Sequence, residues 1–283
     1  MDGKLVLFED AQAFLDAAGE LLYAQESVNN LILGVSERLT RDPQAYENPF
    51  FAVVIETVGR VQLASVMTPP HNLILAGTED FEMGFEPLIN HFKGNPSDVP
   101  GVVGPIQMVE PFVRAWESII GQPAALSMNE RVYELRSVVM PPMPDGQFRC
   151  AAAPDIPILT RWLQAFEREA LGEKHAAEPE RVTRLVDGGQ FFVWDRSEMP
   201  VSMAMYTRPI THSITISAVY TPPAQRRQGY ATALVAHLSQ HLLDEGYQFI
   251  NLFTDLANPT SNAIYQKIGY RAVCDFCMYT FMD

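Results

Sequence analysis

The chain has 283 residues, of which 47% are hydrophobic and 19% are charged, as in ordinary globular proteins. Its formal net charge is −14: residues 1–140 hold 8 Lys and Arg against 19 Asp and Glu (−11), and residues 141–283 hold 12 against 15 (−3). Such acidity argues against non-specific binding to nucleic acids, which needs a cationic surface. It suits a solubilising surface or, alternatively, a cationic substrate.

Targeting and metal-binding signals are weak throughout. No run reaches the roughly 18 apolar residues of a membrane-spanning helix, and Met1–Asp10 lacks the basic and apolar regions of a signal peptide. We therefore expect a cytoplasmic protein whose three cysteines are reduced. Cys274 and Cys277 form a CxxC without a second pair, on a strand where positions three apart face opposite sides, so we expect no metal site. His237 and His241 lack the glutamate of the HExxH motif and fit an ordinary helix surface.

The length suits two domains of about 140 residues each. In the first half, hydrophobic periodicity and turn residues indicate both helices and strands. The predicted elements are helix over 9–38, in one or two pieces, strands over 51–56, 60–68 and 72–76, helix over 79–92, strand over 101–105, helix over 109–120 and strand over 126–139.

Residues 141–146 (Pro-Pro-Met-Pro-Asp-Gly) have the composition of a linker. The elements predicted after it are strand 148–152, helices 156–171 and 180–186, strands 191–195, 201–207 and 213–220, helix 228–245, strand 249–254, helix 259–268 and strand 270–281. Because this order repeats that of the first half, we predict tandem α/β domains over 1–140 and 147–283. Each would have a mixed, mostly antiparallel sheet flanked by helices. An unrelated α+β domain in the first half is the alternative.

One connection in the second half has the character of a phosphate-binding loop. Two prolines end the strand that leads into it, Arg226-x-x-Gly229-x-Ala231 follows, and a helix begins there. Small residues let a ligand approach the backbone closely. The first helical turn offers unpaired N–H groups and the positive end of the helix dipole. Strand, loop and helix start together suit a pyrophosphate, and an ordinary turn is the alternative.

This loop resembles the acetyl-CoA loop of the GNAT (GCN5-related) N-acetyltransferases. The stretch Asn258–Tyr270 resembles that family's second block, Asn-x-x-Ala/Ser-x-x-x-Tyr-x-x-x-Gly-Phe/Tyr. The two blocks occur in the family's order, and the resemblance covers roughly residues 147–283. Nothing in Gly101–Gln122 matches the loop, so the first half is interpreted as a degenerate copy. The cofactor-binding residues that the resemblance implies are Ala218, Val219, Tyr220, Arg226, Arg227, Gln228, Gly229, Tyr230, Ala231, Asn258 and Ser261.

The resemblance also implies roles in acyl transfer. The amides of Arg226–Ala231 would hold the pyrophosphate, pantetheine would extend along Ala218–Tyr220, and the Val219 N–H would stabilise the oxyanion. Tyr265 would act as the acid toward the leaving thiolate. A tyrosine pKa of about 10 against a thiol pKa near 8.5 makes full proton transfer uphill by roughly 2 kcal/mol, so an assisting hydrogen bond is favoured. A buried core tyrosine is the alternative.

No single residue is marked as the base that deprotonates the amine. The candidates are Asp255, Glu167, Glu169 and His212, with a chain of water molecules as the alternative. The sequence does not identify the acceptor amine, the role of the first domain or the oligomeric state. We predict an acetyl-CoA-dependent N-acetyltransferase that acts on a small-molecule amine, without a metal, nucleic-acid or membrane partner. The alternatives are a catalytically silent CoA-binding sensor or scaffold, and a protein-lysine acetyltransferase.

Overall fold

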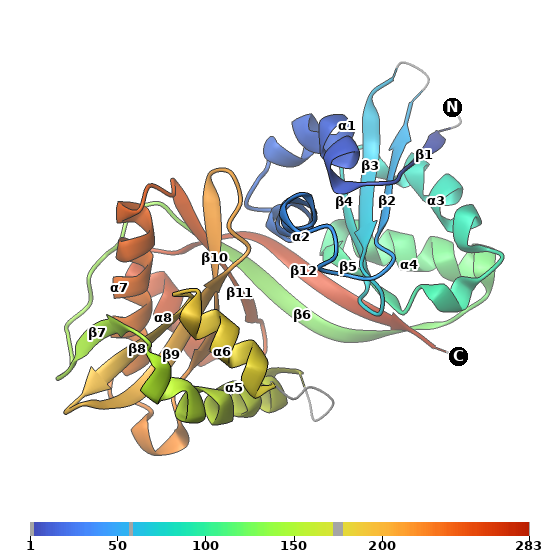
Figure 1. Cartoon of the computed structure of the whole chain (residues 1–283). Coiled ribbons are helices and arrows are strands. Elements are labelled where there is room, and N and C mark those ends of the chain that lie inside the picture. Colours follow the sequence, from blue (N-terminus) through green and yellow to red (C-terminus); the bar gives the residue numbers. More distant parts are fainter. Residues whose placement is uncertain (1–2, 57–58, 172–177, 283) are drawn as a thin grey trace. The chain divides into compact units, whose positions relative to one another are not determined.

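The computed structural model describes residues 3–56, 59–171 and 178–282 and divides into two compact units (Figure 1). Unit 1 comprises Met1–Val132 and Val273–Asp283, and unit 2 comprises Tyr133–Ala272. Among the described helices, none has the length and apolar character needed to cross a membrane.

Unit 1 is a sheet with helices packed on it. Its strand order is β1-β2-β3-β4-β5-β12-β6, antiparallel between β1, β2, β3 and β4, with a parallel pair at β4 and β5. Its elements are β1 (Lys4–Phe8), α1 (Ala11–Tyr23), α2 (Asn30–Arg41), β2 (Phe50–Ile55), β3 (Val61–Met67), β4 (Leu73–Gly77), the 3₁₀ turn η1 (Phe81–Gly84), α3 (Phe85–Phe92), η2 (Pro96–Asp98), β5 (Gly101–Pro105), α4 (Ile106–Ile120), β6 (Ala124–Leu135) and β12 (Arg271–Phe281).

The two faces of this sheet are buried by different helices. Neighbouring side chains on a strand point to opposite faces. Phe51 of β2 contacts Phe14 of α1, with ring centroids 5.6 Å apart. Ala52 and Val54 belong instead to the core cluster that contains the buried residues of α3 and α4. The alternation of apolar residues in β2 thus places helices on both faces.

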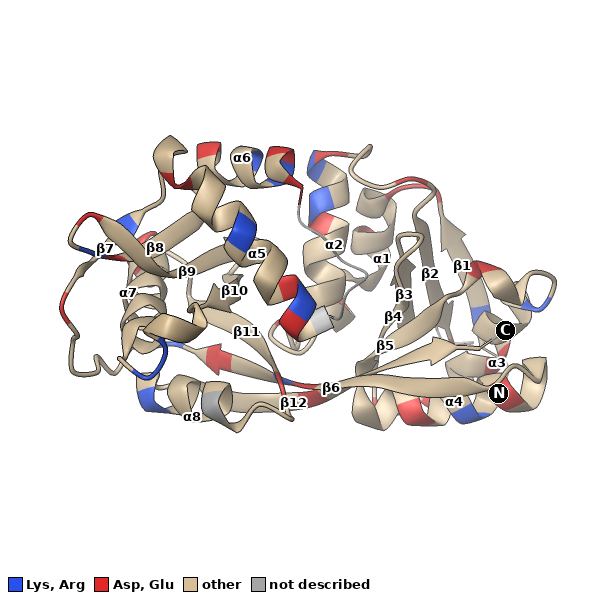
Figure 2. Cartoon of the chain, turned by 90° about the horizontal axis from the view of Figure 1, so that it is seen from below, with Lys and Arg blue, Asp and Glu red and all other residues tan. Residues whose placement is uncertain are grey.

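Unit 2 repeats this arrangement. Its strand order is β6-β11-β10-β9-β8-β7, with antiparallel pairing from β7 to β10 and a parallel pair at β10 and β11. Its elements are β7 (Gln147–Cys150), η3 (Ala153–Asp155), α5 (Ile156–Leu171), α6 (Pro179–Asp187), β8 (Phe191–Arg196), β9 (Met199–Thr207), β10 (Ser213–Tyr220), η4 (Pro223–Gln225), α7 (Tyr230–Asp244), β11 (Phe249–Asp255) and α8 (Pro259–Ile268). Figure 2 shows α5 and α6 on one face of this sheet and α8 on the other, with both acidic and basic residues on α5 and α6.

Strands β6 and β12 each contribute residues to both units. Strand β6 belongs to unit 1 up to Val132, and β12 belongs to unit 1 from Val273 onward. There β12 lies between β5 and β6 and pairs antiparallel with β5 over Phe276–Thr280. Residues 147–283 were predicted as the second domain, and the structure differs at this last strand, which belongs to unit 1 from Val273 onward. Periodicity identifies a strand but not the strand that it pairs with.

Candidate active site

Strand β10 carries a bulge near its end. Between Ser217 and Tyr220 it advances three residues while its partner β9 advances two, so one residue is extra. Ala218 adopts φ +50°, in the left-handed region that non-glycine residues rarely enter. On the other side, the described parallel pairing with β11 extends over Ser213–Ile216. Neither register includes Ala218 or Val219, so a ligand extended along this strand end would meet their main-chain groups.

The bulge also reverses the face of the sheet toward which the last residues of β10 point. In an uninterrupted strand every second residue lies on the same face. Ile214 and Ile216 lie in the core cluster with α7 and α8, whereas Ala218 and Tyr220 lie in the cluster with α5 and α6. Val219 is partly buried and packs against the α7 and α8 cluster. The backbone therefore reverses its facing at the predicted pantetheine segment.

The loop after β10 has the backbone of an anion-binding turn. It passes through η4, and Arg227 then adopts φ +64°. Gly229 follows at φ +85° and ψ −1° as the N-cap of α7, whose first turn has no side-chain cap. Left-handed residues beside helical ones make concave arrays of N–H groups that suit anions. A Cβ on Gly229 would lie 3.9 Å from Pro144, an ordinary contact, so the positive φ rather than crowding accounts for glycine here.

Arg226 is held by neighbouring groups. Its Nε donates to the Thr221 carbonyl oxygen at 2.8 Å, and its Nη2 donates to both carboxylate oxygens of Glu169 at 3.0 and 2.9 Å. Its guanidinium carbon lies 5.6 Å from the centroid of the Tyr220 ring. Both charged side chains are exposed, and such pairs contribute at most about 1 kcal/mol. An incoming pyrophosphate can therefore compete with Glu169 for this cation.

The remaining loop side chains have different surroundings. Arg227 and Gln228 are exposed, Ala231 is partly buried, and Tyr230 is buried in the α7 core. The Tyr230 hydroxyl donates to Gln228 Oε1 at 3.0 Å and accepts from Arg196 Nη1 at 3.2 Å. Tyr230 thus faces inward and can serve a cofactor only through its main-chain N–H.

A buried serine holds the start of the loop. The Ser202 Oγ, from β9, donates to the Tyr220 carbonyl oxygen at 3.1 Å and lies 2.8 Å from the Thr221 hydroxyl. Ser202 is fully buried. Ser202 was not predicted as a site residue, since one serine inside an apolar strand belongs to no motif.

Asn258 begins α8 as its N-cap. Its Oδ1 accepts from the Ser261 main-chain N–H at 3.1 Å, and Pro259 is the first helical residue. Asn258 is exposed and Ser261 is partly buried. Because capping uses the Asn258 oxygen and the Ser261 N–H, the groups left for a cofactor are the Asn258 amide nitrogen and the Ser261 hydroxyl.

Tyr265 lies further along the same helix and is only 7% exposed. Its ring centroid is 6.3 Å from that of Tyr133 and 5.9 Å from that of Tyr270. Burial raises the pKa of Tyr265 well above its usual range. Among the described residues, none forms a hydrogen bond with its hydroxyl. Tyr265 therefore stays protonated at neutral pH with its O–H available to a ligand.

The three carboxylates among the candidate bases are occupied by other contacts. Glu167 is buried and accepts from Arg181 Nη1 at 2.8 Å, and Glu169 pairs with Arg226. The Asp255 carboxylate accepts from the Ala257 main-chain N–H at 2.7 Å. None of these three carboxylates is singled out as a base by its surroundings.

The equivalent connection in unit 1 follows a strand without a bulge and is acidic. Strand β4 matches β10, because each precedes a helix and a parallel strand in its own sheet. It pairs with β3 in unbroken register through Gly77, and residues 78–84 then lead to α3. This segment and the first turn of α3 contain Glu79, Asp80, Glu82 and Glu86.

The counterpart of the loop was expected within Gly101–Gln122, and this expectation is wrong. That stretch is β5 and α4, which match β11 and α8. Gly101 serves strand packing instead, since a Cβ there would collide with the Tyr279 carbonyl oxygen of β12. Sequence order alone does not show which strands are neighbours in a sheet, so it does not locate the equivalent connection.

The cysteine and histidine pairs with metal-like spacing have ordinary structural surroundings. Cys277 is buried and Cys274 is partly buried. His237 stacks on Phe148 with ring centroids 5.7 Å apart, and His241 lies 3.2 Å from Glu245. Over the described part of the chain, no group of three or more His, Cys, Asp or Glu side chains is placed to hold a metal ion.

Comparison with known proteins addresses both units. Residues 156–270 match the family model described as the acetyltransferase (GNAT) family. No curated protein matches the chain.

Solved structures are similar over nearly the whole chain. A GCN5-related N-acetyltransferase from Sphaerobacter thermophilus has a TM-score of 0.66 at 14% identity, covering 97% of this chain and 94% of that one. A GNAT-family acetyltransferase from Colwellia psychrerythraea has a TM-score of 0.58 at 11% identity, covering 99% and 100%. A tandem GNAT protein from the clavulanic acid biosynthesis pathway has 0.57 at 12%, covering 99% and 98%. The predicted mixed α/β tandem fold is thereby confirmed.

Proposed function

Because residues 156–270 form an acetyltransferase domain of the GNAT family, we propose that this chain moves the acetyl group of acetyl-CoA to the primary amine of a small molecule. The observation that carries the proposal is the bulge at Ala218 followed by the left-handed Arg227 and Gly229 at the start of α7. It combines strand backbone that lies outside both neighbouring registers, for pantetheine, with an array of N–H groups for pyrophosphate.

In this mechanism the amine nitrogen attacks the thioester carbonyl carbon directly. A C–N bond forms, the C–S bond breaks, the nitrogen loses one proton, and the sulfur gains one. The Val219 N–H is proposed to stabilise the developing oxyanion, because it lies at the bulge outside both strand registers. The amine proton is proposed to pass to water rather than to a carboxylate, since Glu167, Glu169 and Asp255 already have partners.

Tyr265 is proposed to support the leaving sulfur. Its raised pKa makes complete proton transfer to a thiolate less favourable than for an ordinary tyrosine. The same rise keeps the O–H intact as a hydrogen-bond donor. The proposed role is therefore donation to the thiolate while the C–S bond breaks, with the proton then supplied by solvent.

Turnover of acetyl-CoA with a panel of amines tests the proposal. We expect free thiol to appear only when a small primary amine is present, with the acetylated amine as the product detected by mass spectrometry. A protein-lysine acetyltransferase would instead yield acetylated protein. Tight acetyl-CoA binding without turnover on any amine would overturn the proposal and favour a sensor or scaffold.

Unit 1 is proposed to be a degenerate copy that binds no acetyl-CoA. Its counterpart of the phosphate loop carries Glu79, Asp80 and Glu82, which would repel pyrophosphate. Calorimetry on the intact chain is expected to give one acetyl-CoA site per chain. Two equivalent sites would contradict the assignment, whereas absence of any site would contradict the proposed function itself.

A further inference from the structure

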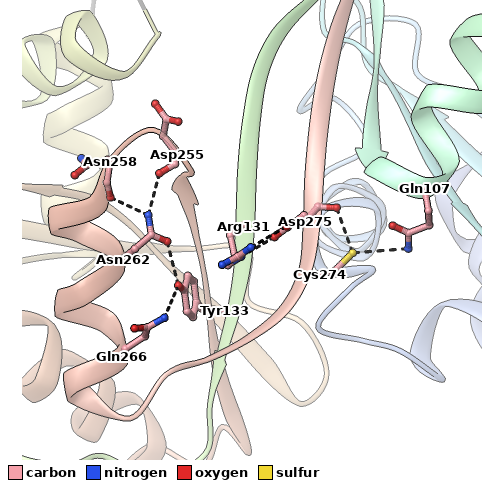
Figure 3. A network of polar contacts seen from close by, with 9 residues as sticks. All are labelled: Gln107, Arg131, Tyr133, Asp255, Asn258, Asn262, Gln266, Cys274 and Asp275. Carbon is pink, nitrogen blue, oxygen red and sulfur yellow. Dashed lines mark hydrogen bonds and ion pairs between the residues drawn. The ribbon is translucent and has the colours of Figure 1, made fainter.

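Helix α8, which bears Tyr265, is attached to the sheet through Asn262. The Asn262 Nδ2 donates to the carbonyl oxygen of Asp255 at 3.1 Å and to that of Asn258 at 2.8 Å. Its Oδ1 accepts from the Tyr133 hydroxyl at 3.0 Å. Figure 3 shows Asn262 between the end of β11, the start of α8 and Tyr133. One side chain thus joins the helix start to two strands.

The direction of these hydrogen bonds follows from the acceptors. Main-chain carbonyl oxygens can only accept, so the Asn262 nitrogen must face Asp255 and Asn258. Its oxygen must then face Tyr133, which makes the Tyr133 hydroxyl the donor. The Tyr133 oxygen in turn accepts from Gln266 Nε2 at 3.3 Å. The chain of bonds runs from Gln266 through Tyr133 to Asn262 with one consistent direction of donation.

Tyr133 touches three positions of α8. Asn262 and Gln266 are one helical turn apart on the same face, and the Tyr133 hydroxyl bridges them. Between them lies Tyr265, whose ring centroid is 6.3 Å from that of Tyr133. Tyr133 is fully buried on β6, so its own position is fixed by packing. A fixed point that bridges 262 and 266 sets the rotation of α8 and hence the direction of residue 265.

We propose that Tyr133 is a positioning residue for acetyl transfer, which acts by holding α8 so that the Tyr265 hydroxyl is presented to the leaving sulfur. This inference rests on the proposed function, because it assigns Tyr133 a part in the step that Tyr265 assists. Misplacement of a reacting group by about 1 Å can cost on the order of 10²-fold in rate. A small rotation of α8 therefore suffices to affect turnover while the cofactor loop before α7 is unchanged.

Tyr133→Phe tests this inference, with Tyr270→Phe as the matched control. Tyr270 is also a buried tyrosine in ring contact with Tyr265, but its hydroxyl lies 2.8 Å from Ser239 of α7 rather than on α8. We expect Tyr133→Phe to lower kcat by about 10-fold with KM for acetyl-CoA changed by less than about 2-fold. Tyr270→Phe should leave kcat within about 2-fold. Equal losses of kcat in the two variants would overturn the proposal.

A double-mutant cycle separates positioning from general destabilisation. If Tyr133 acts through Tyr265, Tyr133→Phe should cause no further loss of kcat when Tyr265 is already Phe. The same 10-fold loss in that background would show that Tyr133 acts by another route and would overturn the inference.

Hydrogen exchange distinguishes failure of this inference from failure of the proposed function. Tyr133→Phe should speed exchange of the α8 amides relative to Tyr270→Phe, whether or not any amine is acetylated. If turnover is absent with every amine, the proposed function fails, and the same comparison still decides the positioning. Equal α8 exchange in the two variants would contradict it.

Discussion

Gly229→Asp is expected to weaken acetyl-CoA binding by at least about 100-fold while the protein remains folded. A carboxylate at the N-cap of α7 would lie beside the bound pyrophosphate. Two unit charges 4 Å apart repel by about 4 kcal/mol at an effective dielectric constant of 20, and each 1.4 kcal/mol is a factor of ten in affinity. In the free protein a Cβ at this position makes only ordinary contact with Pro144, at 3.9 Å. Calorimetry gives the affinity, and thermal melting reports the fold.

Gly229→Asn is the matched control. Asparagine and aspartate have nearly the same shape, and both tolerate the left-handed conformation better than most residues do. Any strain from φ +85° is therefore common to both variants. The difference between them measures the charge, and the difference between asparagine and glycine measures the close approach of ligand to backbone. Acetyl-CoA affinity unchanged in a folded Gly229→Asp protein would remove this loop as the phosphate site.

Tyr265→Phe is expected to lower turnover by about 10²-fold or more, with little change in acetyl-CoA affinity. The substitution keeps the ring contacts with Tyr133 and Tyr270. It strands no described hydrogen-bond partner, so the melting temperature should change little. A structural tyrosine with a bonded hydroxyl would instead cost about 1–3 kcal/mol of stability and spare the rate. Single-turnover kinetics and melting on one preparation separate the two, and wild-type acetyl transfer would exclude Tyr265 as the donor.

Two further measurements on Tyr265→Phe vary the leaving group of the acyl donor and the pH. The loss should shrink with an acyl donor whose thiol is more acidic, because that thiolate needs less stabilisation. The donor must be protonated, so its contribution is lost only as pH rises through its pKa. Burial raises the pKa of Tyr265 above the usual value of about 10, so no alkaline loss from this residue is expected below that pH.

Local patterns made most of the fold predictable. Helix α8 begins and ends where the capping Asn258, Pro259 and the following Gly269 indicate. Strand β1 was missed, because its burial alternates weakly and it lies at a sheet edge. The place of β12 in unit 1 was also missed, since its partner β5 lies far away in the sequence. Local periodicity carries no information on such pairing.

The candidate site was predictable where a residue type itself indicates an unusual backbone conformation. Gly229 indicated a special conformation, which the structure has at φ +85°. Ala218 gave no such signal, because its left-handed φ comes from the bulge and alanine does not ordinarily favour it. The contacts of Tyr133 with Asn262 were equally hidden, since they join residues 129 apart in the chain.

The place of β12 affects how the polypeptide can be made. Strand β5 is synthesised long before the residues at 276–280 that pair with it. While the ribosome is still translating the second half, that edge of the first sheet has exposed main-chain groups and the Trp116 ring lacks Phe281, which stacks on it at 4.3 Å. Unit 1 therefore cannot complete its fold before unit 2 has been translated. Domains of multidomain proteins usually fold in order from the N-terminus during synthesis. Completion of unit 1 requires Val273–Phe281, which follow all of unit 2 in the chain.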